Sequence, residues 1–409
     1  MDEIRDSLFE EEESDKSLLG AVFLISGTCI GAGMLALPFV TSLSGFYPSL
    51  LIGTLCWLFM MVTGLLFLEA TLWLPDGANV LSITKRFLGR GGELVAGVTF
   101  LFLYYCLLVS YMDEGTPLLK NILTQITGLE IPNGYDSLLF TFIFGLMVLW
   151  GTKLVTHINW FLVAGLIISY MYLISAGNKN VTSENIEASR WGLWLFAAPT
   201  LFSAYGYHNI IPTLSTYMKR DAPKLRLAII FGTTLPFIVY SLWQWMVIGS
   251  VPSNELAQAT SGELRSFEIL ESVTHNPWIG VVGGAFAFFA LVTSLLGVSL
   301  SMVDFLGDGF GVKRSGITRA WLCSLVFIPP MIITFYNPGI FITAIGIAGG
   351  FGEAILNGII PIAMFWIGKY TLRLDTKLWI PGGRVTLALL LLATLFIMCL
   401  EAYHLLFFA

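Results

Sequence analysis

Charged residues are scarce in this chain of 409 residues, because Asp, Glu, Lys and Arg make up only 12% of it. An average soluble domain carries about 25%. Hydrophobic residues account for 56% of the chain and aromatic residues for 14%. A soluble enzyme or a nucleic-acid-binding domain needs a polar surface that this composition does not supply. We therefore predict an all-α integral membrane protein that lies in a lipid bilayer and has no nucleic-acid partner.

Cysteine and catalytic motifs are also sparse. The five cysteines form an odd number and contain no CxxC pair, which argues against a disulfide framework or a zinc site. The sequence contains no HExxH and no GxSG motif, and the glycine run at 307–311 is not followed by the GK[ST] of a phosphate loop. We expect no cofactor and no enzymatic activity, so an intramembrane enzyme is a distant alternative.

The negative charge is confined to one end of the chain. Residues 1–17 contain eight acids and two bases, which accounts for the whole net charge of -6, and the other residues balance at 19 acids and 19 bases. This segment has no apolar periodicity and is predicted to be a disordered cytoplasmic tail. Its acidity also argues against a cleaved signal peptide, which starts with basic residues.

Long apolar runs dominate the rest of the chain. A helix that crosses a bilayer needs about 20 mostly apolar residues, and eleven runs meet this requirement. They are 18–40, 46–69, 93–111, 136–152, 158–176, 191–216, 227–250, 278–304, 317–335, 339–367 and 384–408.

The basic residues between these runs predict the orientation. With a cytoplasmic N-terminus, 17 of the 21 Lys and Arg residues lie inside and 4 lie outside, as the positive-inside rule expects. An additional or missing span would reverse every later loop and remove this bias. We therefore predict eleven spans, a cytoplasmic N-terminus and a periplasmic C-terminus.

Two of the predicted spans contain helix-breaking residues. Span 1 carries glycines at 27, 31 and 33 and then Pro38, and span 6 carries Gly206 and then Pro212. Paired broken helices in two halves of a chain indicate the site of a secondary transporter. Because spans 1 and 6 run in opposite directions, they predict two inverted repeats, 18–176 and 177–368. A cytoplasmic linker and an eleventh span follow in 369–409.

The unwound segments predict a receptor for an amino acid. Free N–H groups at Gly31–Gly33 would bind a carboxylate, and free carbonyls near 202–206 would bind an ammonium group. Aromatic residues at a similar depth on spans 3 and 6 would stack on an aromatic side chain.

Several of these segments resemble the hydroxy/aromatic amino acid permease family, which includes the bacterial tyrosine and tryptophan permeases. The resemblance lies in GTCIGAGMLALP (27–38), SITKRFLGR (82–90), SAYGYHNIIPTLSTYM (203–218) and PKLRLAIIFGTTLPFIVY (223–240). The resemblance covers residues 17–370. Within the family, the sequence is most similar in character to the chlamydial tyrosine permeases. The long acidic tail departs from the family.

The resemblance implies a fold and an activity. It implies the leucine-transporter-like fold of the amino acid–polyamine–organocation superfamily, with spans 1 and 6 unwound at the membrane midplane. It also implies proton-driven uptake of tyrosine or tryptophan by alternating access across the bacterial inner membrane. Gly31, Ala32 and Gly33 match its carboxylate-binding turn, the carbonyls of Leu201, Phe202 and Ala204 match its amino-group ligands, and Tyr207 matches an aromatic wall position.

Together, chemistry and resemblance assign one set of residues to the substrate. The predicted substrate site comprises Thr28, Gly31, Ala32, Gly33, Tyr104, Tyr105, Leu201, Phe202, Ala204, Tyr205 and Tyr207. The sequence does not rank tyrosine, tryptophan and phenylalanine, and we expect a monomer.

The coupling ion has two candidate sites. Ionisable side chains inside the membrane usually have a functional role, and Glu353 and His208 are the candidates for a proton site. A sodium ion is the alternative, because Thr293 and Ser294 resemble the hydroxyl pair that binds sodium in coupled relatives. The resemblance adds the carbonyls of Gly27, Ile30 and Ala290 to that site.

Overall fold

The structure is a computed structural model that describes residues 18–42, 44–132, 134–252, 266–376, 378–379 and 381–407. The acidic segment 1–17, for which we predicted disorder, lies outside the described residues.

The described part of the chain consists of helices. Those that matter below are Leu18–Cys29, α2 (Gly33–Ser42), α3 (Phe46–Leu72), α4 (Val80–Thr127), α5 (Tyr135–Trp150), α6 (Thr152–Gly177), α7 (Ser183–Glu187), α8 (Ala198–Ala204), η3 (His208–Ile210), α9 (Ile211–Tyr217), α10 (Ala222–Ser250), α12 (Ser266–Thr274), α13 (Pro277–Phe310), α14 (Gly316–Tyr336), α15 (Phe341–Ile347), the π-helix η4 (Ala348–Ile359), α16 (Ile360–Trp366), the π-helical turn η5 (Ile367–Thr371) and α17 (Arg384–Phe407).

By length and composition, eight helices in the described residues could cross a membrane. A ninth is added if Leu18–Cys29 and α2, which meet at an angle of 55°, form one bent span. Two of the eleven predicted runs stay outside this count. The run at 136–152 forms α5, which has only 16 residues, and the run at 191–216 is divided into short helices.

Helix α4 extends well beyond the predicted run at 93–111. It contains 48 residues, with a bend at Gly89, whose φ of 70° is outside the helical range. Beyond the apolar run it still has a structural role, because the Asp113 carboxylate accepts the Gly339 and Phe341 N–H groups at 3.0 and 2.9 Å. These are the N–H groups at the start of α15, which need an acceptor outside their own helix.

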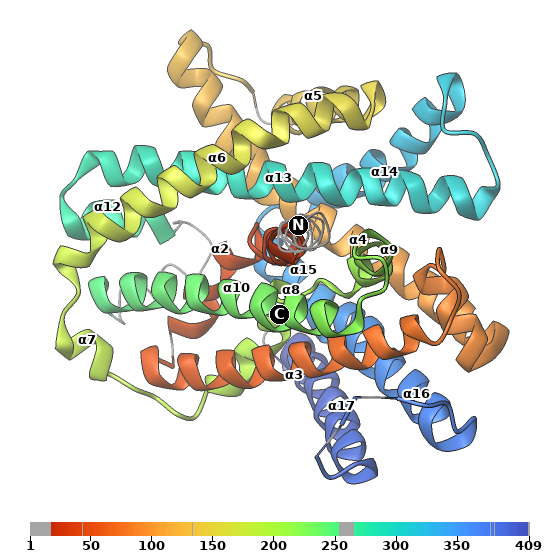
Figure 1. Cartoon of the computed structure of the whole chain (residues 1–409). Coiled ribbons are helices and arrows are strands. Elements are labelled where there is room, and N and C mark those ends of the chain that lie inside the picture. Colours follow the sequence, from red (N-terminus) through yellow and green to blue (C-terminus); the bar gives the residue numbers. More distant parts are fainter. Residues whose placement is uncertain are drawn as a thin grey trace, which may run out of the picture.

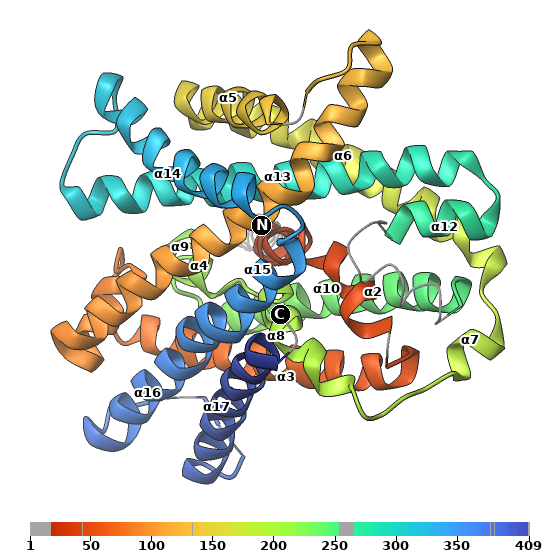
Figure 2. The same cartoon turned by 180° about the vertical axis from the view of Figure 1, so that it is seen from behind.

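The long helices pack in pairs. Helix α10 lies along α3, α6 lies along α13, and α5 lies along α14 (Figure 1). Helix α4 packs against α13 and against α15, η4 and α16, as the opposite view also shows (Figure 2). The broken helices α2 and α8 contact each other at the centre.

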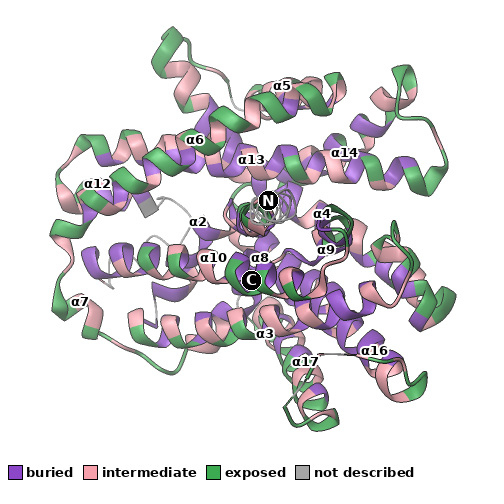
Figure 3. Ribbon diagram, viewed as in Figure 1, coloured by how far each residue is buried: buried purple, intermediate pink, exposed green. Residues whose placement is uncertain are grey.

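Burial follows the same arrangement. Buried residues are concentrated on α2 and α8, and exposed residues are frequent on α5 and α6 (Figure 3). The exposed side chains of α6 include Trp160 and Phe161, at 76% and 80% exposure. Large apolar side chains exposed in this way indicate contact with lipid. The chain is therefore a multi-pass membrane protein.

Glycines allow neighbouring helices to approach the segment α15–η4 closely. A Cβ on Gly349 would overlap the Pro199 carbonyl of α8, and one on Gly352 would lie 2.9 Å from the Leu103 Cβ of α4. On another face, a Cβ on Gly358 would lie 2.7 Å from the Thr394 methyl group of α17. The π-helix is therefore held by three different elements.

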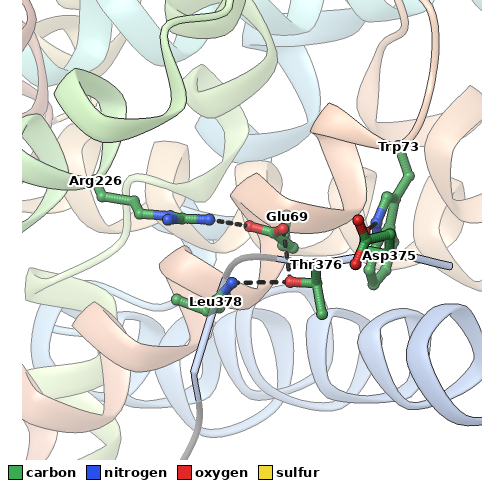
Figure 4. Close-up of polar contacts among 6 residues, drawn as sticks. All are labelled: Glu69, Trp73, Arg226, Asp375, Thr376 and Leu378. Atoms are coloured by element: carbon green, nitrogen blue, oxygen red, sulfur yellow. Dashed lines mark hydrogen bonds and ion pairs between the residues drawn. The ribbon is translucent and has the colours of Figure 1, made fainter.

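A polar cluster joins the end of α3 to the start of α10 and to the segment before α17 (Figure 4). We call Glu69, Trp73, Arg226, Asp375, Thr376 and Leu378 the Glu69 cluster. The Arg226 guanidinium lies 2.9 Å from one Glu69 oxygen, and the Thr376 hydroxyl donates to the other at 2.6 Å. The Trp73 indole N–H donates to the Asp375 carbonyl at 2.7 Å.

Candidate substrate and ion site

The first apolar helix is interrupted between Leu18–Cys29 and α2. Side chains from two distant helices bind the backbone at this break. The Ala32 N–H donates to the Ser294 hydroxyl of α13 at 3.1 Å, and the Cys29 carbonyl accepts the Tyr240 hydroxyl of α10 at 2.5 Å. These two backbone groups therefore have partners, as buried backbone groups require.

A second break separates α8, which ends at Ala204, from η3, which begins at His208. Pro212 stands in the first turn of α9, where its missing N–H costs no helical hydrogen bond. The Ala204 carbonyl accepts from the Tyr240 hydroxyl at 2.9 Å. Tyr240 therefore contacts one carbonyl at each break.

The two breaks lie against each other. A Cβ built on Gly33 would lie 3.0 Å from the Ala204 Cα and 3.3 Å from the Ala204 Cβ. A Cβ on Gly31 would overlap the Ser294 hydroxyl and lie 3.8 Å from the Ala290 carbonyl oxygen. Both positions therefore need glycine for close approach to another segment rather than for an unusual backbone angle.

A cavity of about 90 Å³ lies beside the breaks. One water needs about 10–15 Å³ by this measure, so the cavity has room for several waters or a small polar group. It is enclosed by Thr28 before the first break, by residues at the second break and by residues of α3, α4, α13 and η4. They are Thr28, Phe67, Val80, Phe100, Leu103, Tyr104, Leu107, Tyr111, Ser203, Gly206, His208, Asn209, Val298, Glu353, Leu356 and Asn357.

Glu353 supplies a buried carboxyl group to this cavity, with 5% of the residue exposed. The Asn357 amide, one turn further along the π-helix, donates to it. A Cβ on Gly206 would overlap the same carboxyl group, so Glu353 lies directly against the second break. The Asn209 amide, also at this break, donates to the Tyr104 hydroxyl at 3.0 Å.

His208 borders the cavity from the other side of the break and is 2% exposed. Its Nε2 atom lies 3.0 Å from the Thr63 hydroxyl of α3. The structure thus brings both predicted proton-site residues to one cavity.

The predicted substrate residues fall into two groups. Thr28 and Tyr104 border the cavity, and so do the two proton-site candidates. The others do not border it. Tyr105 donates to the Leu325 carbonyl at 2.8 Å, and Tyr207 donates to the Met60 carbonyl at 3.1 Å.

The remaining predicted residues pack around the breaks. The Phe202 ring stacks on Phe59 at 4.8 Å, and the Tyr205 ring lies 5.2 Å from Tyr240. Gly33 and Ala204 form the contact between the two broken helices, and Gly31 and Ala32 lie against Ser294 of α13. Leu201 is fully buried in the apolar core.

The predicted sodium ligands are partly brought together. Ser294 and the Ala290 carbonyl lie beside Gly31, while the Thr293 hydroxyl donates to the Ala290 carbonyl of its own helix at 3.0 Å. A Cβ built on Gly27 would have open space around it, and Ile30 is partly buried. In the described residues, no group of three or more His, Cys, Asp or Glu side chains could hold a metal ion.

Four polar residues of the cavity were missed in the sequence. Tyr111 follows Tyr104 by seven positions and so shares its helix face. Asn357 follows Glu353 by four positions, and Ser203 and Asn209 flank the glycine of the second break. Helical spacing from the residues already identified would have found the first two.

Known proteins resemble this chain in sequence. The profile of the tryptophan/tyrosine permease family matches residues 14–401. The "Tryptophan-specific transport protein" of Pseudomonas aeruginosa is 30% identical over 357 residues, which cover 85% of each chain. "Tyrosine-specific transport system 1" of Haemophilus influenzae is 30% identical over 382 residues, which cover 91% of this chain and 93% of the relative.

A solved structure resembles it in fold. The crystal structure of MhsT in complex with L-phenylalanine aligns with a TM-score of 0.62, covering 94% of this chain and 98% of that chain. The sequence identity is 15%, so this likeness shows the fold alone. That fold is of the leucine-transporter type.

Proposed function

Because this chain belongs to the tryptophan/tyrosine permease family, we propose that it is a secondary active symporter that imports tyrosine or tryptophan. The observation that carries the proposal is the cavity beside two broken helices. It is bordered by Thr28 near the end of the first helix, by residues of the second break and by the buried Glu353 carboxyl group. The family is one of permeases, so the protein is a transporter and not an enzyme.

Eleven spans are our proposal for the membrane topology. To the eight long helices and the bent pair we add α5 and the divided span that runs through α8 and α9. The distribution of basic residues supports a cytoplasmic N-terminus and a periplasmic C-terminus. The bacterial transport proteins that the chain resembles support a bacterial inner membrane.

Two inverted repeats, 18–176 and 177–368, are supported by the packing. In such repeats span 1 corresponds to span 6, span 2 to span 7 and span 4 to span 9. The contacts of α2 with α8, of α3 with α10 and of α5 with α14 join these corresponding spans. Helices α6 and α13 are spans 5 and 8, and the segment α15–α16 and helix α4 are spans 10 and 3. The contact of α6 with α13 therefore corresponds to the contact of α15–α16 with α4.

We place the amino acid at the cavity with its polar groups toward the breaks; the cavity, which has room for several waters, must widen to hold it. The Ala32 N–H and the Ala204 carbonyl, which we expected to bind the substrate, are paired with Ser294 and Tyr240 in this conformation. Substrate binding at the Ala32 N–H therefore requires Ser294 to give up its bond, whereas the Ala204 carbonyl has a second lone pair and can accept from a ligand beside Tyr240. Thr28 and Ser203 also border the cavity, and the Thr28 hydroxyl, which donates to the Leu24 carbonyl at 2.8 Å, can still accept a hydrogen bond.

We propose a proton as the coupling ion and Glu353 as the group that carries it. Glu353 is the acidic side chain among the described residues that border the cavity. Burial in low dielectric disfavours a charged carboxylate, so proton binding there is coupled to the polarity of the cavity. Sodium bound by Ala290, Thr293 and Ser294 is the alternative, because oxygen ligands suit a hard cation.

The test is uptake of labelled tyrosine and tryptophan into proteoliposomes with proton and sodium gradients imposed separately. We expect accumulation with an inward proton gradient and none with sodium alone. Accumulation driven by sodium alone would contradict proton coupling and favour the alternative. Absence of saturable uptake of either amino acid would contradict the transport proposal itself.

A matched pair of variants tests the residue. Glu353→Gln keeps the hydrogen-bonding shape but cannot release a proton, so we expect loss of proton-driven accumulation. Glu401→Gln is the control, because Glu401 is also buried, at 3% exposure, and packs against the same segment, α15–η4, from α17 but does not border the cavity. Proton-driven accumulation that survives in Glu353→Gln would remove Glu353 from this role.

A further inference from the structure

One ring nitrogen of His208 has a partner and the other does not. Nε2 lies 3.0 Å from the Thr63 hydroxyl, whereas Nδ1 is enclosed and has no hydrogen-bond partner among the described residues. The ring is 2% exposed and borders the cavity together with Phe67 and Asn209. A buried polar atom without a partner is costly and rare, so this nitrogen requires an explanation.

The surroundings of Thr63 decide which nitrogen carries the hydrogen. The Thr63 hydroxyl lies 3.1 Å from the Phe59 carbonyl and 3.3 Å from the Met60 carbonyl of its own helix. A threonine inside a helix donates to such a carbonyl. We assign the single Thr63 hydrogen to these carbonyls, so that the Thr63 oxygen accepts the hydrogen of Nε2.

This assignment leaves Nδ1 as an acceptor. In a neutral imidazole one nitrogen donates and the other accepts. With the hydrogen on Nε2, the lone pair of Nδ1 has no donor among the described residues. Nδ1 is enclosed in this conformation, so a donor on a ligand reaches it only when the cavity beside His208 widens. Apolar and aromatic side chains, including Phe67 and Phe100, border the same cavity and suit a ring-shaped ligand.

We propose that Nδ1 of His208 accepts a hydrogen bond from the end of the substrate side chain, and so selects tyrosine or tryptophan over phenylalanine. The donor is the phenol O–H of tyrosine or the indole N–H of tryptophan. Phenylalanine has no such donor and leaves Nδ1 unpaired. The inference rests on the proposed transport of aromatic amino acids and adds the residue that reads the side chain.

The size of the preference follows from the unpaired atom. A site that hydrogen-bonds a substrate group rejects an analogue without that group, because its own polar atom stays unpaired. For one neutral acceptor we expect a loss of affinity of about 10- to 100-fold.

The first experiment uses the unmodified protein and measures binding and uptake for two pairs of compounds. L-tyrosine is compared with L-phenylalanine, and L-tryptophan with 3-benzothienyl-L-alanine, in which sulfur replaces the ring N–H. We expect the donor-free member of each pair to bind about 10- to 100-fold more weakly. Equal affinities within both pairs would overturn the inference while leaving aromatic amino acid transport intact.

Two substitutions of the histidine identify the atom. His208→Leu removes the acceptor, so the ratio within each pair should fall toward one. His208→Asn places a carbonyl oxygen near the position of Nδ1 and should retain part of the preference. A preference that is unchanged in His208→Leu would overturn the inference, whatever happens to the overall rate.

Thr63→Val keeps the histidine and tests the same inference if the variants at position 208 do not fold. It removes the group that fixes the hydrogen on Nε2, so the donor preference should decrease. Thr71→Val is the matched control, since Thr71 is a buried threonine of the same helix whose hydroxyl donates to the Phe67 carbonyl at 2.8 Å. Equal preferences in Thr63→Val and Thr71→Val would contradict the role of Thr63 and with it the acceptor assignment.

The same compounds separate this role from proton coupling. If His208 carried the coupling proton instead, His208→Leu would abolish proton-driven accumulation but leave the tyrosine-to-phenylalanine binding ratio as in the unmodified protein. That result would also overturn the inference.

Discussion

The ion pair between Glu69 and Arg226 should contribute strongly to the stability of the protein. The Glu69 side chain is 7% exposed and the Arg226 side chain 22%, so water screens the pair poorly. Removing one partner of a buried pair leaves a buried charge uncompensated, which costs about 3–5 kcal/mol. Because Arg226 keeps some contact with solvent, we expect about 3 kcal/mol for Arg226→Gln.

The assay is thermal unfolding of the detergent-solubilised protein, followed by tryptophan fluorescence. A loss of this size should lower the apparent melting temperature by roughly 5 °C or more. Thr376→Val removes one hydrogen bond to the same carboxylate and should cost about 1.5–3 kcal/mol. The control is Lys85→Gln, because Lys85 pairs with Glu93 at 2.9 Å with side-chain exposures of 52% and 33%. An exposed pair contributes at most about 1 kcal/mol.

The double variant Glu69→Gln with Arg226→Gln tests the reasoning further. It removes both charges and leaves neither unpaired, so its effect should be smaller than the sum of the two single effects. The reasoning is refuted if Arg226→Gln is no more destabilising than Lys85→Gln, or if the two single effects add in the double variant.

Three further substitutions test the contacts at the centre of the fold. Gly33→Val places a side chain against the backbone of α8 and should abolish tyrosine and tryptophan uptake. The control is Gly53→Ala, at a glycine with open space around it, which should retain uptake. Normal uptake in Gly33→Val would contradict the contact between the breaks. In Gly349→Ala the new methyl group overlaps a backbone carbonyl of α8, so this variant should lose about 1–3 kcal/mol of stability in the same melting assay. The control Gly297→Ala, at a glycine with open space around it, should be nearly neutral. Equal melting temperatures of the two variants would show that the π-helix is not closely packed at Gly349. Tyr240→Phe removes a hydroxyl that binds two buried carbonyls and should cost about 1–3 kcal/mol; an unchanged melting temperature would mean that these carbonyls find other partners.

Local features of the sequence predicted much of the architecture. Apolar runs correspond to the long helices, because a bilayer-spanning helix needs a continuous apolar stretch. The glycine and proline clusters lie where the described helices are interrupted, at residues 30–32 and 205–207. Helix propensity is a local property, so such positions can be identified without knowledge of their neighbours.

Partners across the fold could not be predicted. Tyr240 lies in an apolar helix and carries no signal that it binds carbonyls at two breaks. The helical residues of α4 after its apolar run were also missed, since the sequence alone does not distinguish Asp113 from a loop residue; its contact with the start of α15 appears only in the fold. Aromatic depth alone did not distinguish Tyr104, which borders the cavity, from Tyr105, which points to α14.

The Tyr240 hydroxyl couples the hydrogen bonding of the two broken helices. It has a single hydrogen and lies within reach of two carbonyls, at 2.5 Å from Cys29 and 2.9 Å from Ala204. Any rotation that strengthens one of these bonds weakens the other, and the carbonyl that loses the hydrogen becomes the better acceptor for a positively charged group. A movement at one break that shifts the Tyr240 hydrogen therefore changes the hydrogen bonding of the carbonyl at the other break.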